Sequence, residues 1–250
     1  MAVRKQPTDR FWEIDALRGI AICMMIIYHL FFDLNYFGVY STDLYSLPVL
    51  LFLYPIGTVF LLLVGISLTL SYSRAKQTHT KAQLRIKYLK RGSGIFGLGM
   101  LVTLVTWVYP HDGFIVFGVL HCIGISILLA YPLISSRALA FLVGVLCIGI
   151  GVLLQNMVTV DFPWLLWIGI VPRQFYTLDY FPLLPWFGVV LIGIVLGNTL
   201  YQNDTRRFTI KEYSHNPVSR LFCFLGRYSL LIYLLHQLLI VGLLYVFFLR

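Results

Sequence analysis

The chain has 250 residues, of which 59% are hydrophobic and only 12% are charged. Soluble domains carry roughly 45 to 50% apolar and about 25% charged residues, so this composition excludes an ordinary soluble domain and predicts an integral protein of the lipid bilayer. The formal net charge of +9 does not require a nucleic-acid partner, because the basic residues gather in a few loops. The four cysteines lack CxxC spacing, and we interpret them as packing residues.

Apolar segments long enough to cross a bilayer follow one another along the whole chain. At about 20 residues per crossing, the pattern predicts about seven transmembrane helices. The first apolar run is longer than the ~7 to 15 residues of a signal-peptide core, so we expect the first helix to remain in the protein. The predicted fold is an all-α, polytopic membrane bundle that forms a single domain over residues 1–250. The predicted segments are 14–37, 48–72, 92–109, 114–134, 138–158, 181–201 and 221–248.

Two further features refine this bundle. The stretch before the sixth segment, residues 162–180, is short and interrupted by proline, which indicates an interfacial or re-entrant lid rather than a crossing. Small residues recur in "GSGIFGLG" and "GVVLIGIVLG", a spacing that lets helix backbones approach closely. We therefore expect a compact bundle without separate domains.

Basic residues are concentrated in alternate connections. By the positive-inside rule, this bias predicts a cytoplasmic amino terminus and, with seven crossings, an outer carboxyl terminus. We expect the membrane to be the bacterial cytoplasmic membrane. The basic residues concerned are Arg4, Lys5 and Arg10 at the amino terminus, Arg74, Lys76, Lys81, Arg85, Lys87, Lys90 and Arg91 after the second segment, and Arg206, Arg207, Lys211 and Arg220 before the last.

One face of the first segment is polar from end to end, with Asp15, Arg18, His29 and Asp33. Placing an Asp or Arg at the centre of a membrane costs on the order of 2.5 to 3.5 kcal/mol, so this face must line a cavity or meet polar partners. His29 and Asp33 lie one helical turn apart, and a carboxylate at this spacing can orient an imidazole and keep it basic. We therefore predict that His29 and Asp33 are catalytic. Arg18 is explained either by a phosphate ligand or by an ion pair with Asp15.

Two other histidines, His121 and His236, lie in the fourth and seventh segments and could share a layer with His29. Each either contacts a substrate or donates a hydrogen bond to a backbone carbonyl and joins helices. An alternative is a zinc site built from the three histidines and Asp33, because both residue types are suitable zinc ligands. The ligands come singly from separate helices, so we expect no metal.

A basic cluster, Lys87, Lys90 and Arg91, immediately precedes the glycine-rich start of the third predicted segment at Gly92. Backbone N–H groups and the dipole at a helix start favour anions, so the cluster predicts a site for a phosphate-bearing ligand on the cytoplasmic side. The same residues would also suit anionic lipid headgroups beside the membrane.

The segment "EIDALRGIAICMMIIYHLFFDL" resembles the opening of the transmembrane acyltransferases related to the catalytic part of heparan-alpha-glucosaminide N-acetyltransferase. "FGVLHCIGIS", "DYFPLLPWFGVVLIGIVLG" and "LGRYSLLIYLLHQ" are similar to later membrane motifs of that family, in the same order. The spacing of Arg18 and His29 is also similar to the arginine and histidine signature of the acyltransferase type three family. The resemblance implies transfer of an acyl group from a coenzyme A thioester inside to an acceptor outside.

The predicted function is accordingly a membrane acyltransferase that uses acetyl-CoA and an amino-sugar or other glycan acceptor. Arg18 with the basic cluster Lys87, Lys90 and Arg91 would bind the cofactor phosphates. His29 would be the general base or a transient acyl carrier, Asp33 would orient it, and His121 or His236 would contact the acceptor. The alternative is a transporter or channel with a polar proton or ion path. The sequence is compatible with a homo-oligomer and does not predict the oligomeric state.

Overall fold

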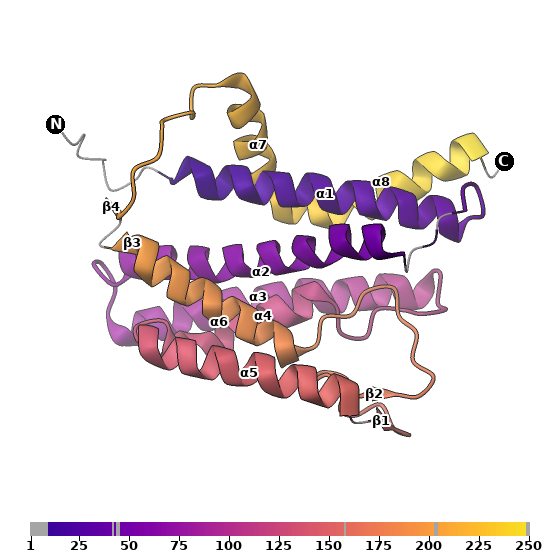
Figure 1. The fold of residues 1–250 in the computed structure, drawn as a ribbon, viewed down its shortest axis with the longest axis horizontal. Coiled ribbons are helices and arrows are strands. Elements are labelled where there is room, and N and C mark those ends of the chain that lie inside the picture. The colour runs from indigo at the N-terminus through magenta and orange to yellow at the C-terminus, as the bar shows by residue number, and fades with distance from the viewer. Residues whose placement is uncertain (1–9, 42, 44–45, 158, 203–204, 249–250) are drawn as a thin grey trace. The chain divides into compact units, whose positions relative to one another are not determined.

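The computed structural model describes residues 10–41, 43, 46–157, 159–202 and 205–248; Arg4 and Lys5 lie outside this part. The described residues form eight α-helices, which confirms the predicted all-α fold (Figure 1). Very short strands occur in two pairs, β1 (Thr159–Val160) with β2 (Val171–Pro172) and β3 (Tyr201–Gln202) with β4 (Thr205–Arg206). The helices are α1 (Trp12–Tyr36), α2 (Leu47–Ala75), α3 (Lys81–Val108), α4 (Val119–Ala130), α5 (Arg137–Met157), α6 (Leu183–Leu200), α7 (Pro217–Arg227) and α8 (Ser229–Phe248).

Six of the described helices, all except α4 and α7, are long and apolar enough to cross a membrane, which confirms a polytopic protein. The fourth predicted segment differs from the expectation. Its helix α4 has 12 residues, or about 18 Å at ~1.5 Å per residue, which is shorter than a bilayer core of ~30 Å. Before α4 the chain is extended, and Phe117 forms an isolated bridge with Tyr180. After α4, a 3₁₀ turn containing Pro132 replaces the α-helix.

The final predicted segment is also not one helix. Asn216 caps α7 by accepting a hydrogen bond from the N–H of Val218 at 2.9 Å, and Pro217 occupies the first turn, where its missing N–H costs nothing. The helix ends at Arg227, and Tyr228 leaves helical geometry before α8 begins at Ser229. The break coincides with the short polar stretch from Arg227 to Ser229, inside the predicted segment 221–248.

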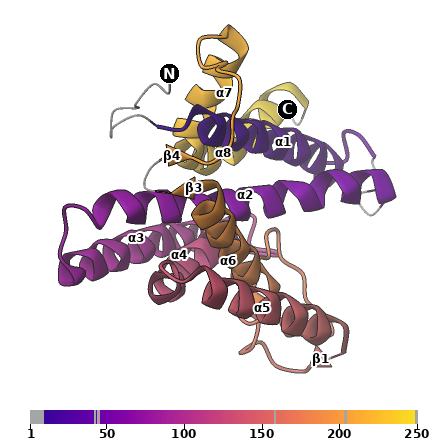
Figure 2. The same cartoon turned by 60° about the vertical axis from the view of Figure 1, so that its left-hand side comes forward.

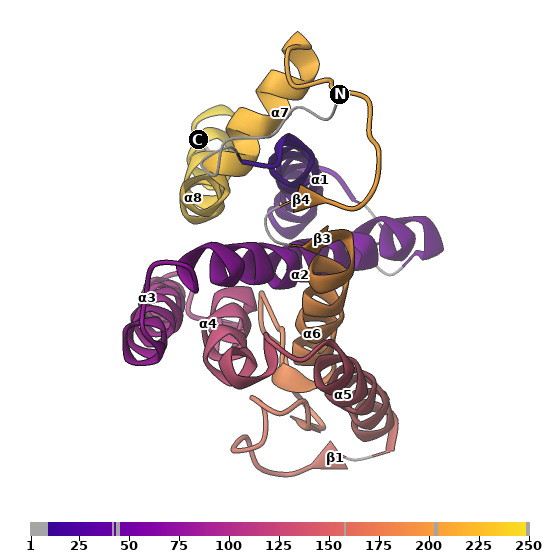
Figure 3. The same cartoon turned by 90° about the vertical axis from the view of Figure 1, so that its left-hand side faces the viewer.

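Contacts divide the chain into two units, residues 1–60 with 209–250 and residues 61–208. In the first unit, α1 packs against both α7 and α8 (Figures 1 and 3). The crossing of α1 and α7 is tight because it uses glycines. A Cβ atom on Gly226 would collide with the backbone carbonyl oxygen of Asp15, and one on Gly19 would collide with that of Phe222. Further along α1, Ile22 and Met25 form a buried apolar cluster with Ile56.

In the second unit, α3 packs on α4, and α5 packs on α6 (Figure 2). Both pairs approach through small residues: a Cβ on Gly92 would lie 2.8 Å from the Gly124 carbonyl oxygen, and one on Gly188 would lie 2.6 Å from that of Gly144. These contacts confirm close packing at Gly92 and Gly188, whereas a Cβ on Gly94 or Gly97 would meet nothing within 4 Å. Residues 162–180 contain no α-helix, as expected for a stretch that does not cross the membrane.

Candidate active site

A polar layer lies between α1 and α8 in the first unit. It consists of His29 and Asp33 on α1 and of His236 and Gln237 on α8. The Gln237 side-chain nitrogen donates to both carboxylate oxygens of Asp33, at 2.8 and 2.9 Å. Asp33 is only 2% exposed, and a buried carboxylate needs such partners. The carboxylate is therefore bound by a residue of α8, whereas the sequence predicted that it would orient His29.

The two histidines of this layer lie against each other. The ring centroids of His29 and His236 are 4.8 Å apart, with an angle of 61° between the ring planes. His236 is buried, and its Nδ1 lies 2.6 Å from the backbone carbonyl oxygen of Tyr233. A carbonyl oxygen only accepts hydrogen bonds, so Nδ1 must carry the hydrogen. In the neutral ring, Nε2 of His236 then presents a lone pair.

Hydrogen-bonding capacity is left unused in this layer. Among the described residues, His29 Nδ1, His236 Nε2 and Gln237 Oε1 are buried and have no hydrogen-bond partner. Each buried polar atom without a hydrogen bond lowers the stability of the fold by about 1 to 3 kcal/mol. Three such atoms lie in this one layer of α1 and α8, so they call for a functional explanation. The layer can bind a polar group and can accept or donate protons.

His121, the third histidine of the predicted site, belongs to the second unit, and its hydrogen bonding differs from that of His29 and His236. Its Nδ1 accepts from the N–H of Gly118 at 3.2 Å, and its Nε2 lies 3.3 Å from the Thr103 hydroxyl oxygen. That hydroxyl donates to the Ile115 carbonyl at 2.7 Å, so Nε2 of the imidazole supplies the hydrogen. Both ring nitrogens are thus engaged, and the geometry favours a packing role for His121.

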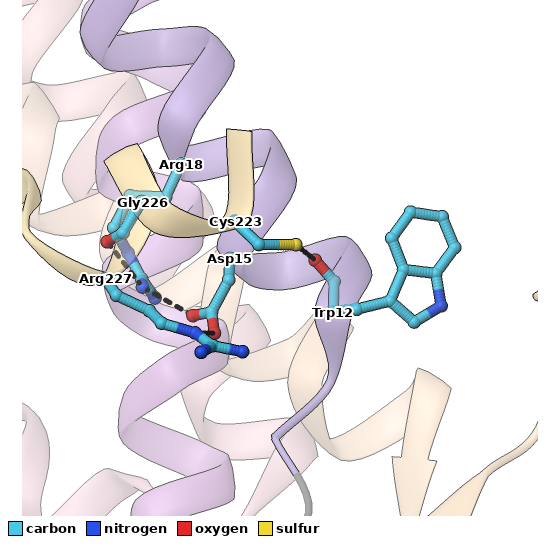
Figure 4. Close-up of polar contacts among 6 residues, drawn as sticks. All are labelled: Trp12, Asp15, Arg18, Cys223, Gly226 and Arg227. Carbon is cyan, nitrogen blue, oxygen red and sulfur yellow. Dashed lines mark hydrogen bonds and ion pairs between the residues drawn. The ribbon is translucent and has the colours of Figure 1, made fainter. Parts of the chain in front are cut away.

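The amino-terminal part of α1 carries a second polar group, at its crossing with α7 (Figure 4). Asp15 is 5% exposed and is bound by two arginines: Arg18 Nη1 at 3.1 Å and Arg227 Nε at 3.3 Å. Arg18 Nη1 also lies 3.4 Å from the Gly226 carbonyl oxygen. The geometry therefore supports the ion-pair explanation of Arg18, and the guanidinium of Arg227, which is half exposed, adds positive charge beside it.

The basic cluster Lys87, Lys90 and Arg91 lies within a helix rather than before one. Thr80 and Gln83 form a capping box, with reciprocal hydrogen bonds of 2.9 and 3.3 Å, so α3 begins at Lys81. The predicted helix start at Gly92 was wrong, and with it the expectation that free backbone N–H groups there favour an anion. The cluster retains its charge and its partial exposure.

The comparison with known families agrees with the resemblance of the motifs. A family model described as heparan-alpha-glucosaminide N-acetyltransferase, catalytic, matches residues 10–238. The chain belongs to this family. No curated protein and no solved structure is similar enough to match. Membership in the acetyltransferase family confirms the predicted relation and, with the six apolar helices, supports a membrane acetyltransferase.

The matched range contains the whole polar layer of α1 and α8, up to Gln237. Sequence reasoning missed two residues of the first unit, Gln237 and Arg227. Two features of the sequence could have indicated Gln237: it directly follows His236, and a buried Asp33 needs a hydrogen-bond donor. Within the described residues, no group of three His, Cys, Asp or Glu side chains could hold a metal ion.

Proposed function

We propose that the protein transfers an acetyl group from cytoplasmic acetyl-CoA to an amino-sugar or other glycan acceptor on the outer face of the membrane. The observation that carries this proposal is the polar layer of α1 and α8, which holds buried, unpaired nitrogen and oxygen atoms inside the range matched by an acetyltransferase family. His121 shows the contrasting case, in which both ring nitrogens are engaged. A reacting layer must leave them available to substrate.

In this proposal His29 is the general base or a transient acyl carrier. A positioned base removes the proton from an amine or hydroxyl in the transition state, which contributes typically 10² to 10⁴-fold in rate. Asp33 supplies negative charge one turn away on α1, and Gln237 holds its carboxylate. His236 contacts the acceptor, because its ring lies against that of His29.

The donor binds through its phosphates to basic side chains on the cytoplasmic side. Arg18 is the candidate in the first unit, and Lys87, Lys90 and Arg91 are the candidates in the second. Arginine suits this role because its planar guanidinium matches phosphate oxygens with two donors. The family supports an acyl donor of this general kind.

The proposed orientation places the amino terminus inside and the Asp112 loop outside. The charge pattern further requires that residues 114–134 cross the membrane, since otherwise the basic loop before α7 would face outward. An extended stretch followed by a short helix can do so, because Phe117 and Gly118 are buried in protein rather than exposed to lipid. Single cysteines at Thr78, Asp112 and Ser135 test this: an impermeant thiol reagent added outside should label only Asp112→Cys.

Proteoliposomes that contain the purified protein provide the functional test. Radiolabelled acetyl-CoA is supplied on the side of the amino terminus and glucosamine on the other side. We expect acetylglucosamine to form on the glucosamine side together with free CoA thiol. Movement of a solute or of protons without thioester consumption would instead support the transporter or channel alternative.

A further inference from the structure

We propose that His29 and His236 act as one pair that carries a single exchangeable proton, with Nε2 of His236 as the atom that receives it. This inference rests on the proposed acyl transfer and deepens it, because it gives His236 a chemical role beyond contact with the acceptor. It also predicts a protonation state that can be observed without any turnover.

His236 is held in one tautomer and one orientation. Its Nδ1 donates to the Tyr233 carbonyl oxygen at 2.6 Å, and this partner belongs to the same helix, three residues earlier. The hydrogen bond fixes both the orientation of the ring and the position of its hydrogen. The buried Nε2 is left without a donor among the described residues. His236 is therefore held as a ready proton acceptor inside the protein.

The ring of His29 lies directly against that of His236. The centroid of His29 lies 4.8 Å from that of His236, and its own Nδ1 is also buried and unpaired in the described part of the chain. Two cationic imidazoles at this separation would repel each other strongly in a site with little water. The pair can therefore hold one extra proton but not two. Asp33, one turn from His29, supplies the negative charge that makes this one proton acceptable.

During acyl transfer, one proton moves from the acceptor through both histidines to the leaving group. The acceptor nitrogen or oxygen forms a bond to the thioester carbonyl carbon and gives its proton to His29. Because no hydrogen bond joins the two rings among the described residues, a bridging water takes the proton from the other ring nitrogen of His29 and passes one to Nε2 of His236. His236 becomes an imidazolium with Nδ1–H still bound to the Tyr233 carbonyl oxygen. When the carbon–sulfur bond breaks, the proton returns along the same path to the leaving thiolate. The products are the acetylated acceptor and the free thiol, and both histidines are neutral again.

Nitrogen NMR on protein labelled with ¹⁵N-histidine tests the resting state. The chain has six histidines, and the signals of His236 can be assigned by their loss in His236→Asn. We expect a protonated Nδ1 and an unprotonated Nε2 for His236 at neutral pH. A hydrogen on Nε2 of the neutral ring would overturn the proposal, whatever the activity of the protein.

Kinetics test the transfer itself, with radiolabelled acetyl-CoA and glucosamine. The variant His236→Asn keeps a side-chain N–H that can donate to the Tyr233 carbonyl but removes the basic lone pair. We expect kcat to fall roughly 100-fold or more, the scale of general-base catalysis, with little change in KM for acetyl-CoA. In His29→Asn/His236→Asn, the rate should stay within about threefold of His29→Asn alone, because groups that act as one unit do not add their effects.

The matched control is His111→Asn. His111 is exposed, and its Nδ1 forms the same kind of bond, 2.6 Å to the Trp107 carbonyl oxygen. Its φ of 71° is tolerated by asparagine, so the rate should match that of the parent. A near-parental rate for His236→Asn, or losses that multiply in the double variant, would refute the pair. If the parent transfers no acetyl group, the proposed function fails, and the NMR result alone decides the state of His236.

Discussion

Helix α1 carries polar groups at two places, and the two places differ in how fully these groups are paired. At the crossing with α7, the Asp15 carboxylate is held by Arg18 and Arg227, and Arg18 also reaches the Gly226 carbonyl oxygen. In the layer with α8, only the Asp33 carboxylate is held, by Gln237. The two histidines there each keep a buried nitrogen without a partner among the described residues.

This difference distinguishes two roles of buried polar groups in a membrane protein, a structural role and a reactive one. A saturated group of charges joins helices, because removal of one partner would leave another buried and unpaired. An unsaturated group keeps the capacity to bind and to exchange protons. His121 illustrates the first role with the same residue type as His236, since both of its ring nitrogens are engaged. Residue type alone therefore does not identify a reacting histidine.

The largest expected effect is that of His29→Ala. The rate of acyl transfer should fall roughly 10² to 10⁴-fold, because the substitution removes the base. The variant should remain folded, because Nδ1 of His29 has no hydrogen bond to lose among the described residues. The measurements are transfer of radiolabelled acetyl groups and monodispersity in detergent. Leu30→Ala, at the next position, which is exposed, is the control. If the His29→Ala protein worked near the parental rate, His29 would only join helices.

The next effect is on stability, at the saturated crossing. Gly226→Ala should lower the free energy of unfolding by about 3 kcal/mol, because the added methyl group must displace the α1 backbone at Asp15. Thermal unfolding in detergent measures this loss. Gly242→Ala is the matched control on α8, where a Cβ atom would meet nothing within 4 Å. Equal stabilities for the two variants would mean that α1 and α7 do not approach as closely as described.

Asp33→Asn should give a smaller loss of activity. The amide keeps the shape, and Gln237 can rotate to present its oxygen to the new N–H₂ group, so folding should change little. Loss of the negative charge beside His29 should slow transfer roughly tenfold, less than loss of the base itself. Turnover and thermal unfolding of the same sample separate the two effects. A loss as large as that of His29→Ala would instead make the carboxylate itself the proton carrier.

The sequence predicts the apolar helices and the polar face of α1 well, because both follow from the composition of one segment at a time. It does not reveal that Asp33 pairs with Gln237, since this contact depends on the register between α1 and α8. It also misplaces the start of α3. The charged run before Gly92 contains strong helix formers, and the cap at Thr80 lies twelve positions upstream of Gly92.

The smallest predicted effect is that of Arg18→Lys, which tests whether Arg18 only joins α1 to α7 or also binds the cofactor. Lysine keeps the charge but loses the planar set of donors that reaches both Asp15 and the Gly226 carbonyl. We expect acetyl-CoA affinity to fall roughly fivefold, about 1 kcal/mol, at unchanged kcat, if Arg18 also binds a cofactor phosphate. Arg220→Lys, on the exposed side of α7, should leave the affinity as in the parent. A less stable protein with unchanged acetyl-CoA affinity would assign Arg18 to the crossing alone, and the phosphates would then be sought at the basic cluster of α3.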